Sequence, residues 1–163
     1  MATIHLRTVT ENDARFLCSV MNTGSILEAL NEVPTTLSDW QSAIREWNND
    51  DDEEDYIIFH GETPVGWLGI NGLSSANSTA FLKLAALLPQ YQGLGIGAAA
   101  IRQVIEILRQ RGYSCVSLYT DQDNRRAQAC YRKCGFRITE SLMDESSNGK
   151  IVPRFRMTLQ LHP

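Results

Sequence analysis

Three glycines alternate in the stretch QYQGLGIGAAA, at positions 93, 95 and 97, and three alanines then begin a helical pattern. The first backbone N–H groups of a helix lack partners within it and lie at the positive end of the helix dipole. Glycines in front of a helix leave these N–H groups bare and tolerate positive φ angles, so that a phosphate can approach the main chain. The pattern therefore predicts a phosphate-binding turn.

Two other glycine-rich phosphate sites fit this sequence less well. A nucleotide P-loop requires GxxxxGK[ST], whereas the Gly149-Lys150 pair is followed by isoleucine. Gly93, Gly95 and Ala98 satisfy a relaxed dinucleotide fingerprint, and an acid follows the next predicted strand. However, QYQ separates the preceding strand from the first glycine, and the chain after Ala98 is too short for a doubly wound sheet.

A second motif lies about thirty residues further along the chain. DNRRAQACYRKCGF (123–136) has the form N-x-x-A-x-x-x-Y-x-x-x-G-F, while QGLGIG (92–97) has the form Q/R-x-x-G-x-G/A. An apolar strand precedes the glycines and a long amphipathic helix follows them. Over residues 81–136 the sequence thus resembles the GNAT superfamily of N-acetyltransferases, which use acetyl-coenzyme A (acetyl-CoA).

The resemblance implies an α/β fold of the acyl-CoA N-acyltransferase type. Its central sheet would be mixed and mostly antiparallel, with a splayed parallel pair at the cofactor cleft and about four flanking helices. It also implies acetyl-CoA as co-substrate and assigns a set of cofactor-binding residues: Leu87, Leu88, Gln92, Gly93, Leu94, Gly95, Ile96, Gly97, Ala98, Asn124, Ala127 and Tyr131.

Within this set, Leu87 and Leu88 would offer strand backbone to the pantetheine arm, and the glycines would hold the pyrophosphate. Gln92 can donate a hydrogen bond from its side-chain amide. Asn124 has two interpretations, because asparagine is favoured as a helix N-cap and the resemblance adds a contact with pantetheine.

Tyr131 is the catalytic residue that the resemblance assigns, as the general acid for the leaving CoA thiolate. A phenol with a pKa of about 10 can protonate or hydrogen-bond a thiolate whose thiol has a pKa of about 8.5. The alternative is a packing role, because Tyr131 shares an apolar helical stripe with Ala127 and Cys134.

The base that deprotonates the acceptor amine is not assigned by the sequence. Strand 79–89 contains no acid and carries Lys83 as its only charge, so a strand-borne carboxylate is in doubt. Four other residues could serve, although each is also an ordinary surface residue: Glu28, Glu32, His60 and Glu62. Backbone N–H groups near Leu87 would meet the oxyanion.

These assignments predict direct transfer of acetyl to a primary amine, on a small molecule or on a protein N-terminus or lysine, in a ternary complex. Segment 21–37 and the C-terminal hairpin would select the acceptor. A covalent intermediate on Cys130 or Cys134 is a weaker alternative. The second hypothesis is a non-catalytic acyl-CoA-binding regulatory module that has lost its base.

The elements that must position these residues follow from periodicity. Strands are predicted over 3–9, 56–60, 64–72, 79–89, 113–120, 136–142 and 150–161, with a turn over 73–78. Helices are predicted to start at Thr10 with Asp13 and at Ser38 with Gln41, then after the glycines and after residue 123. Gly66 and Gly69 within a strand indicate a bulge or a close contact.

Composition limits the class of protein. The 163 residues are 43% hydrophobic and 21% charged, which suits one globular domain over 1–163. The net charge of −4 is concentrated in DDDEED (50–55), which we interpret as a solvated loop or, less favoured, as a lure for a cationic substrate. We expect no nucleic-acid, membrane or metal site. We also expect buried free thiols, a cytoplasmic location, and a monomer or homodimer.

Overall fold

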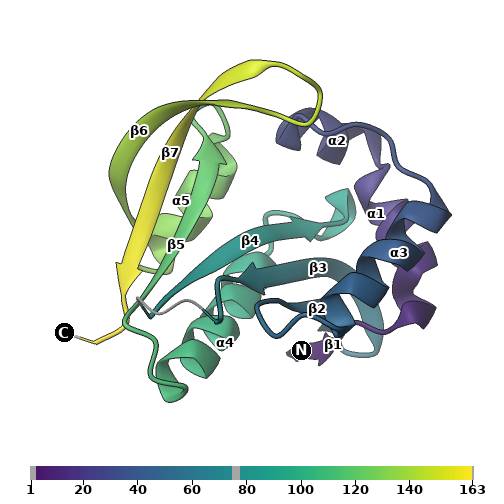
Figure 1. Cartoon of the computed structure of the whole chain (residues 1–163), viewed down its shortest axis with the longest axis horizontal. Helices are drawn as coiled ribbons and strands as arrows, with labels where there is room; N and C mark the ends of the chain where they lie inside the picture. The colour runs from purple at the N-terminus through teal and green to yellow at the C-terminus, as the bar shows by residue number, and fades with distance from the viewer. Residues whose placement is uncertain (1–2, 75–77, 163) are drawn as a thin grey trace.

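One mixed sheet runs through the molecule (Figure 1). The structure is a computed structural model that describes residues 3–74 and 78–162. In these residues the strands are β1 (Ile4–Thr8), β2 (Glu54–His60), β3 (Thr63–Asn71), β4 (Thr79–Leu87), β5 (Cys115–Asp121), β6 (Arg137–Glu145) and β7 (Ile151–Gln160). Their order is β1-β2-β3-β4-β5-β7-β6, in which only β4 and β5 pair in parallel. The predicted mixed, mostly antiparallel sheet with one parallel pair is confirmed.

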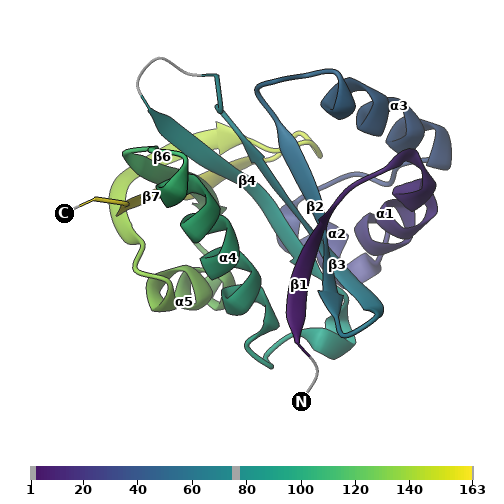
Figure 2. The same ribbon diagram turned by 90° about the horizontal axis from the view of Figure 1, so that it is seen from below.

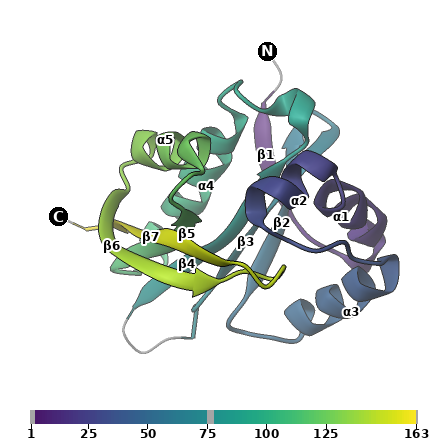
Figure 3. The same ribbon diagram turned by 90° about the horizontal axis from the view of Figure 1, so that it is seen from above.

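Helices cover both faces of this sheet (Figures 2 and 3). Those of the described residues are α1 (Ala14–Met21), α2 (Gly24–Leu30), α3 (Leu37–Asn48), α4 (Ile96–Gln110) and α5 (Arg125–Lys133), with short 3-10 turns η1 (Glu11–Asp13) and η2 (Pro89–Tyr91). The larger apolar core lies under α4 and α5, and a second core lies under α1, α2 and α3. Burial of these two apolar faces stabilises the fold.

Local sequence explains two of the helix starts. The capping box predicted at Thr10 is present, with the Thr10 N–H donating to the Asp13 carboxylate at 2.7 Å. The second box lies two residues before the predicted one, because Thr36 and Asp39 form it in place of Ser38 and Gln41.

The prediction was incomplete or wrong in two segments. Helix α2 lies in the segment 21–37, where no helix was predicted; Gly24 forms its first residue, and Ile26 is its one buried side chain. The run 50–55 is not a solvated loop throughout, because β2 already begins at Glu54 and Asp55 is only 3% exposed. The turn predicted over 73–78 lies partly outside the described residues.

The close contact predicted at Gly66 and Gly69 is confirmed. A Cβ atom on Gly66 would lie 2.2 Å from the Ala86 carbonyl oxygen of β4. The β3–β4 register shifts between Gly69 and Ile70, which forms a bulge. Both glycines therefore serve the approach of β3 to β4, the strand next to the split in the sheet.

Candidate active site

The two parallel strands pair at one end and then separate. β4 and β5 are in register at Thr79–Cys115, Ala80–Val116 and Phe81–Ser117. β4 nevertheless continues to Leu87, and β5 to Asp121 while it remains paired with β7. The splayed pair that was predicted is therefore present, and Figure 1 shows the two strands diverging.

The separated part of β4 offers backbone toward β5. The Leu88 N–H donates to the Val65 carbonyl of β3 at 2.9 Å, so Leu88 is already used within the sheet. Successive residues of a strand direct their N–H and C=O groups to opposite sides, so those of Leu87 face the split. Of the two leucines predicted to pair with pantetheine, Leu87 has the suitable orientation; its carbonyl accepts from the Gln92 side-chain amide, which leaves its N–H facing the split.

The glycine turn lies at the start of α4. Gly93 and Gly95 have φ angles of 76° and 83°, in the left-handed region that favours glycine, and Gly95 is the N-cap. No side chain caps this helix, and a Cβ atom on either glycine would meet nothing within 4 Å. Leu94, between the two glycines, is exposed, and Ile96, which follows them, is buried. The bare amides and open approach fit a phosphate-bearing group.

Gln92 links three parts of the site. Its side-chain amide donates to the Leu87 carbonyl at 3.0 Å, and its side-chain oxygen accepts from the Arg126 guanidinium of α5. Its amide is thus occupied by the protein itself. Arg126 is a cation beside the turn that the sequence analysis missed, although the basic pair Arg125-Arg126 next to the Asn124 motif was a signal for it.

Helix α5 forms the other side of the site. Asn124 is its N-cap, and its side-chain oxygen accepts from the Ala127 N–H at 3.3 Å. The N-cap interpretation is thereby confirmed, whereas the contact with pantetheine stays a prediction. Ala127 is half-buried and lies about two helical turns before Cys134 on the apolar stripe.

Tyr131 is half-buried on α5, with its ring edge-on to Phe136 at 6.0 Å between centroids. Its hydroxyl has no hydrogen-bond partner within residues 3–74 and 78–162. Burial raises the pKa of Tyr131, and the nearby Cys130 and Cys134 thiols raise it further. The phenol therefore stays protonated at neutral pH, as a proton donor requires.

Two cysteines face α4, Cys130 on α5 and Cys134 at the C-cap of α5. The Cys134 sulfur lies 3.7 Å from the Ala98 carbonyl, and the Cys130 sulfur would lie 3.8 Å from a Cβ atom on Gly97. A hydrogen bond from Cys130 lowers the pKa of Cys134 to about 7, against the effect of burial. All four cysteines are free thiols, and in the described part of the chain no His, Cys, Asp and Glu cluster could hold a metal ion.

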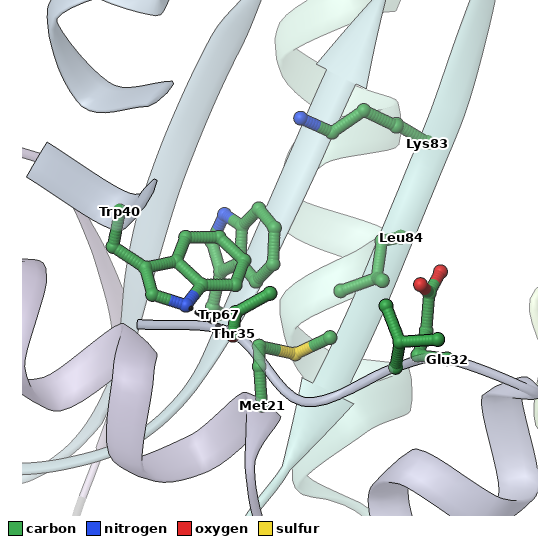
Figure 4. A pocket seen from close by; sticks show the side chains of 8 residues that line it. Met21, Glu32, Thr35, Trp40, Trp67, Lys83 and Leu84 are labelled. Atoms are coloured by element: carbon green, nitrogen blue, oxygen red, sulfur yellow. Dashed lines mark hydrogen bonds between the residues drawn. The ribbon is translucent and has the colours of Figure 1, made fainter. Parts of the chain in front are cut away.

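A pocket of about 260 Å³ opens on the other face of the sheet, beneath α1 and α3 (Figure 4). Apolar side chains form most of its wall: Met21, Val33, Trp40, Trp67 and Leu84. Thr35, Glu32 and Lys83 complete it. Of the proposed bases only Glu32 is part of this pocket, because Glu28 is exposed on α2 and Glu62 is exposed in the β2–β3 turn. His60 lies elsewhere, beside Tyr91 of η2 at 6.2 Å.

Side-chain contacts join α2 to the far half of the sheet. The Asn31 amide donates to the Asp121 carboxylate at 2.6 Å, and Arg154 donates to the same carboxylate at 2.8 Å. Arg154 also bonds to Asp144 and Ser146 at the end of β6. We call this set of five residues the clasp; it joins the end of α2 to the end of β5, beyond the part of β5 that pairs with β4.

A split parallel pair beside a bare helix start defines a class of proteins that bind a phosphate-bearing cofactor through their main chain. A sequence profile of the Acetyltransferase (GNAT) family matches residues 24–136. The chain belongs to this family. A mycothiol acetyltransferase from Thermobifida fusca is 34% identical over 70 residues, which make up 43% of this chain and 22% of that protein. The chain spans less than half the length of the curated relatives that it matches.

Solved structures share the fold over nearly the whole chain. The spermidine N-acetyltransferase of Vibrio cholerae, in complex with CoA and spermine, has a TM-score of 0.87 at 19% identity and covers 97% of this chain and 95% of that one. A ribosomal L7/L12 α-N-protein acetyltransferase, in complex with coenzyme A, has a TM-score of 0.86 at 17% identity, covering 98% and 95%. Among the described residues, no helix is both long and apolar enough to span a bilayer.

Proposed function

We propose that this chain transfers the acetyl group of acetyl-CoA to a primary amine by direct attack in a ternary complex. The observation that carries the proposal is the split between β4 and β5, which ends at a glycine turn with uncapped amides at the start of α4. The family and the CoA complexes of two proteins of the same fold support it. In this proposal the turn and Arg126 hold the diphosphate, and the Leu87 edge pairs with pantetheine.

The chemical step requires two contributions from the chain. As the amine nitrogen bonds to the thioester carbon, negative charge develops on the carbonyl oxygen, and the Leu87 N–H stabilises it. The carbon–sulfur bond then breaks, and Tyr131 donates its proton to the departing thiolate. The proton lost by the amine restores the phenol through water, so no net charge accumulates on the protein.

The acceptor enters from the pocket face in this proposal. The Glu32 carboxylate makes no ion pair or hydrogen bond in the described residues, and it is the one carboxylate among apolar pocket walls. A carboxylate in that position attracts an ammonium group, while the indoles of Trp40 and Trp67 favour an apolar or cationic substituent. The named acceptors of the two solved relatives are a polyamine and a protein N-terminus, both amines.

A second candidate is a non-catalytic acyl-CoA-binding regulatory module. It is favoured by β4, which has no carboxylate and carries Lys83 as its only charge. Release of free thiol from acetyl-CoA, measured with a panel of polyamines, amino sugars and peptides, separates the two candidates. Turnover with any amine supports the enzyme. Tight binding of acetyl-CoA by calorimetry without turnover on the whole panel supports the module, and no binding refutes both.

A further inference from the structure

Lys83 is held on several sides at once. Its ammonium bonds to the Glu53 carboxylate and lies 3.3 Å from Asp55 Oδ1. The same nitrogen lies 4.2 Å from the ring centroid of Trp47 and 5.2 Å from that of Trp67. These four residues form what we call the lysine box, which combines charge pairing with cation–π contacts. Asp55 is on β2, Glu53 directly precedes β2, Trp47 is on α3 and Trp67 is on β3.

Asp55 is the most buried charged residue of the lysine box. Its side chain is 1% exposed; Oδ1 accepts from the Trp67 indole at 3.0 Å, while Oδ2 is buried without a hydrogen-bond partner in the described residues. Gly69 makes space for this arrangement, because a Cβ atom there would lie 2.4 Å from Asp55 Oδ1 and 2.9 Å from Lys83 Cε. A buried carboxylate with one unsatisfied oxygen is costly, which indicates a role besides stability.

The position of Lys83 on β4 suggests that role. Leu82 is opposite Ile70 and Leu84 is opposite Gly69, so Lys83 is the extra residue of the bulge. The last residue of β4 that pairs with β5 is Phe81, two residues earlier. A bulge bends and twists its strand, and here it occurs at the point where the two parallel strands part.

We propose that Lys83 is a positioning residue for the acyl-transfer site. Held in the lysine box, it ties the bulged part of β4 to β2, β3 and α3, and so keeps β4 apart from β5 at the width that the cofactor needs. This inference rests on the proposed function, since it concerns the same cleft. It also explains why a lysine, and no acid, is the charged residue of β4.

The charges of the lysine box make the inference measurable. The titratable groups that face Asp55 are Glu53, directly before β2, and Lys83 on β4; Trp47 and Trp67 are neutral. Burial raises the pKa of Asp55 to about 8, and the neighbouring Glu53 carboxylate adds to this rise against the attraction of Lys83. Ionisation of Asp55 therefore gives Lys83 a second anionic partner and tightens the box.

The first experiment measures acetyl-CoA binding by calorimetry, without acceptor, for Lys83→Met. Methionine keeps the length of the side chain and removes the ammonium. We expect the dissociation constant to rise about tenfold, because a small displacement of β4 spoils an aligned backbone edge. Arg7→Met is the matched control: Arg7 also pairs with a carboxylate, Asp13, and lies over the Phe59 ring, but it is on β1. It should bind acetyl-CoA as the wild type does.

The second experiment uses no variant of Lys83, so its result does not depend on whether Lys83→Met folds. Tryptophan fluorescence is followed from pH 6 to 10, with Asp55→Asn to identify the transition that Asp55 causes. If ionised Asp55 favours the cofactor-binding form of the cleft, bound acetyl-CoA must in turn favour ionised Asp55. Saturating acetyl-CoA should then lower the pH midpoint of the fluorescence transition, by about one pH unit if the coupling is tenfold. The phosphates of the cofactor would shift it upward through charge repulsion, so a downward shift points to the box.

The outcomes separate this inference from the proposed function. Wild-type protein that fails to bind acetyl-CoA refutes the proposed function itself. If the wild type binds, an affinity of Lys83→Met within twofold of it, or a midpoint that acetyl-CoA leaves unchanged or raises, means that the lysine box is only structural. Weaker binding by Lys83→Met together with a lowered midpoint supports the positioning role.

Discussion

Substitution of Tyr131 by phenylalanine tests the chemistry most directly, because it removes a single oxygen atom. That hydroxyl has no protein partner in the described residues, so its loss breaks no hydrogen bond, and the ring keeps its edge-on contact with Phe136. The free energy of unfolding should change by less than about 0.5 kcal/mol. A general acid typically contributes 10²–10⁴-fold to a rate. We therefore expect kcat to fall about 100-fold, which corresponds to about 2.7 kcal/mol of barrier.

The assay combines steady-state thiol release, calorimetry with acetyl-CoA and urea unfolding. Tyr113→Phe is a control of the opposite kind, because the Tyr113 hydroxyl donates to the Leu73 carbonyl at 2.5 Å. That variant should lose about 1 kcal/mol of stability and keep its kcat. For Tyr131→Phe, the acetyl-CoA dissociation constant should stay within about twofold, since a general acid acts on the transition state.

Two results would refute this reasoning. An unchanged kcat in Tyr131→Phe would show that Tyr131 is a packing residue. A wild-type kcat that falls with rising pH well below pH 10 would contradict the raised pKa of Tyr131, because the phenol should remain protonated there.

Three further predictions concern stability. Gly95→Ala should lower the free energy of unfolding by about 1–2 kcal/mol, because Gly95 has a φ of 83°. Gly97→Ala, in the first turn of α4, should raise the free energy of unfolding by up to about 1 kcal/mol. Equal changes for the two variants in urea unfolding would contradict this. Asn124→Ala should cost about 1 kcal/mol and Asn124→Gly only a few tenths, and a parallel loss of acetyl-CoA affinity would reveal the pantetheine contact. Because the folded-state pKa of Asp55 is raised, its protonated carboxyl stabilises the fold. This contribution to the free energy of unfolding is fully present below about pH 4 and declines as pH rises to about 8. Urea midpoints should thus fall between pH 6 and 8.5 in the wild type and stay level in Asp55→Asn.

The cofactor side of the site could be predicted from sequence because its determinants are local. Positive φ angles at Gly93 and Gly95, the N-cap at Asn124 and the period of α4 each depend on a few consecutive residues. Two such motifs at this separation carried the resemblance to the family, and that resemblance implied the split pair of β4 and β5.

The pocket side of the site depends on contacts between distant residues, most of which could not be predicted from the sequence. Lys83 was noted only as the lone charge on its strand, and its partners Glu53 and Asp55 were interpreted as parts of a solvated run. No local pattern distinguishes a solvated aspartate from one buried between a lysine and an indole. The same holds for α2, whose packing is decided by Ile26 and by its contact with Asp121 through Asn31.

The clasp gives the split in the sheet two unlike kinds of attachment. Each of the two diverging strands is held in a ladder on its outer side, β4 by β3 and β5 by β7, and separating a ladder breaks several backbone hydrogen bonds together. The clasp instead joins α2 to the end of β5 through the side chains of Asn31, Asp121 and Arg154, each bond contributing roughly 0.5–3 kcal/mol. The contact of α2 with β5 can therefore be lost bond by bond while the strands keep their register.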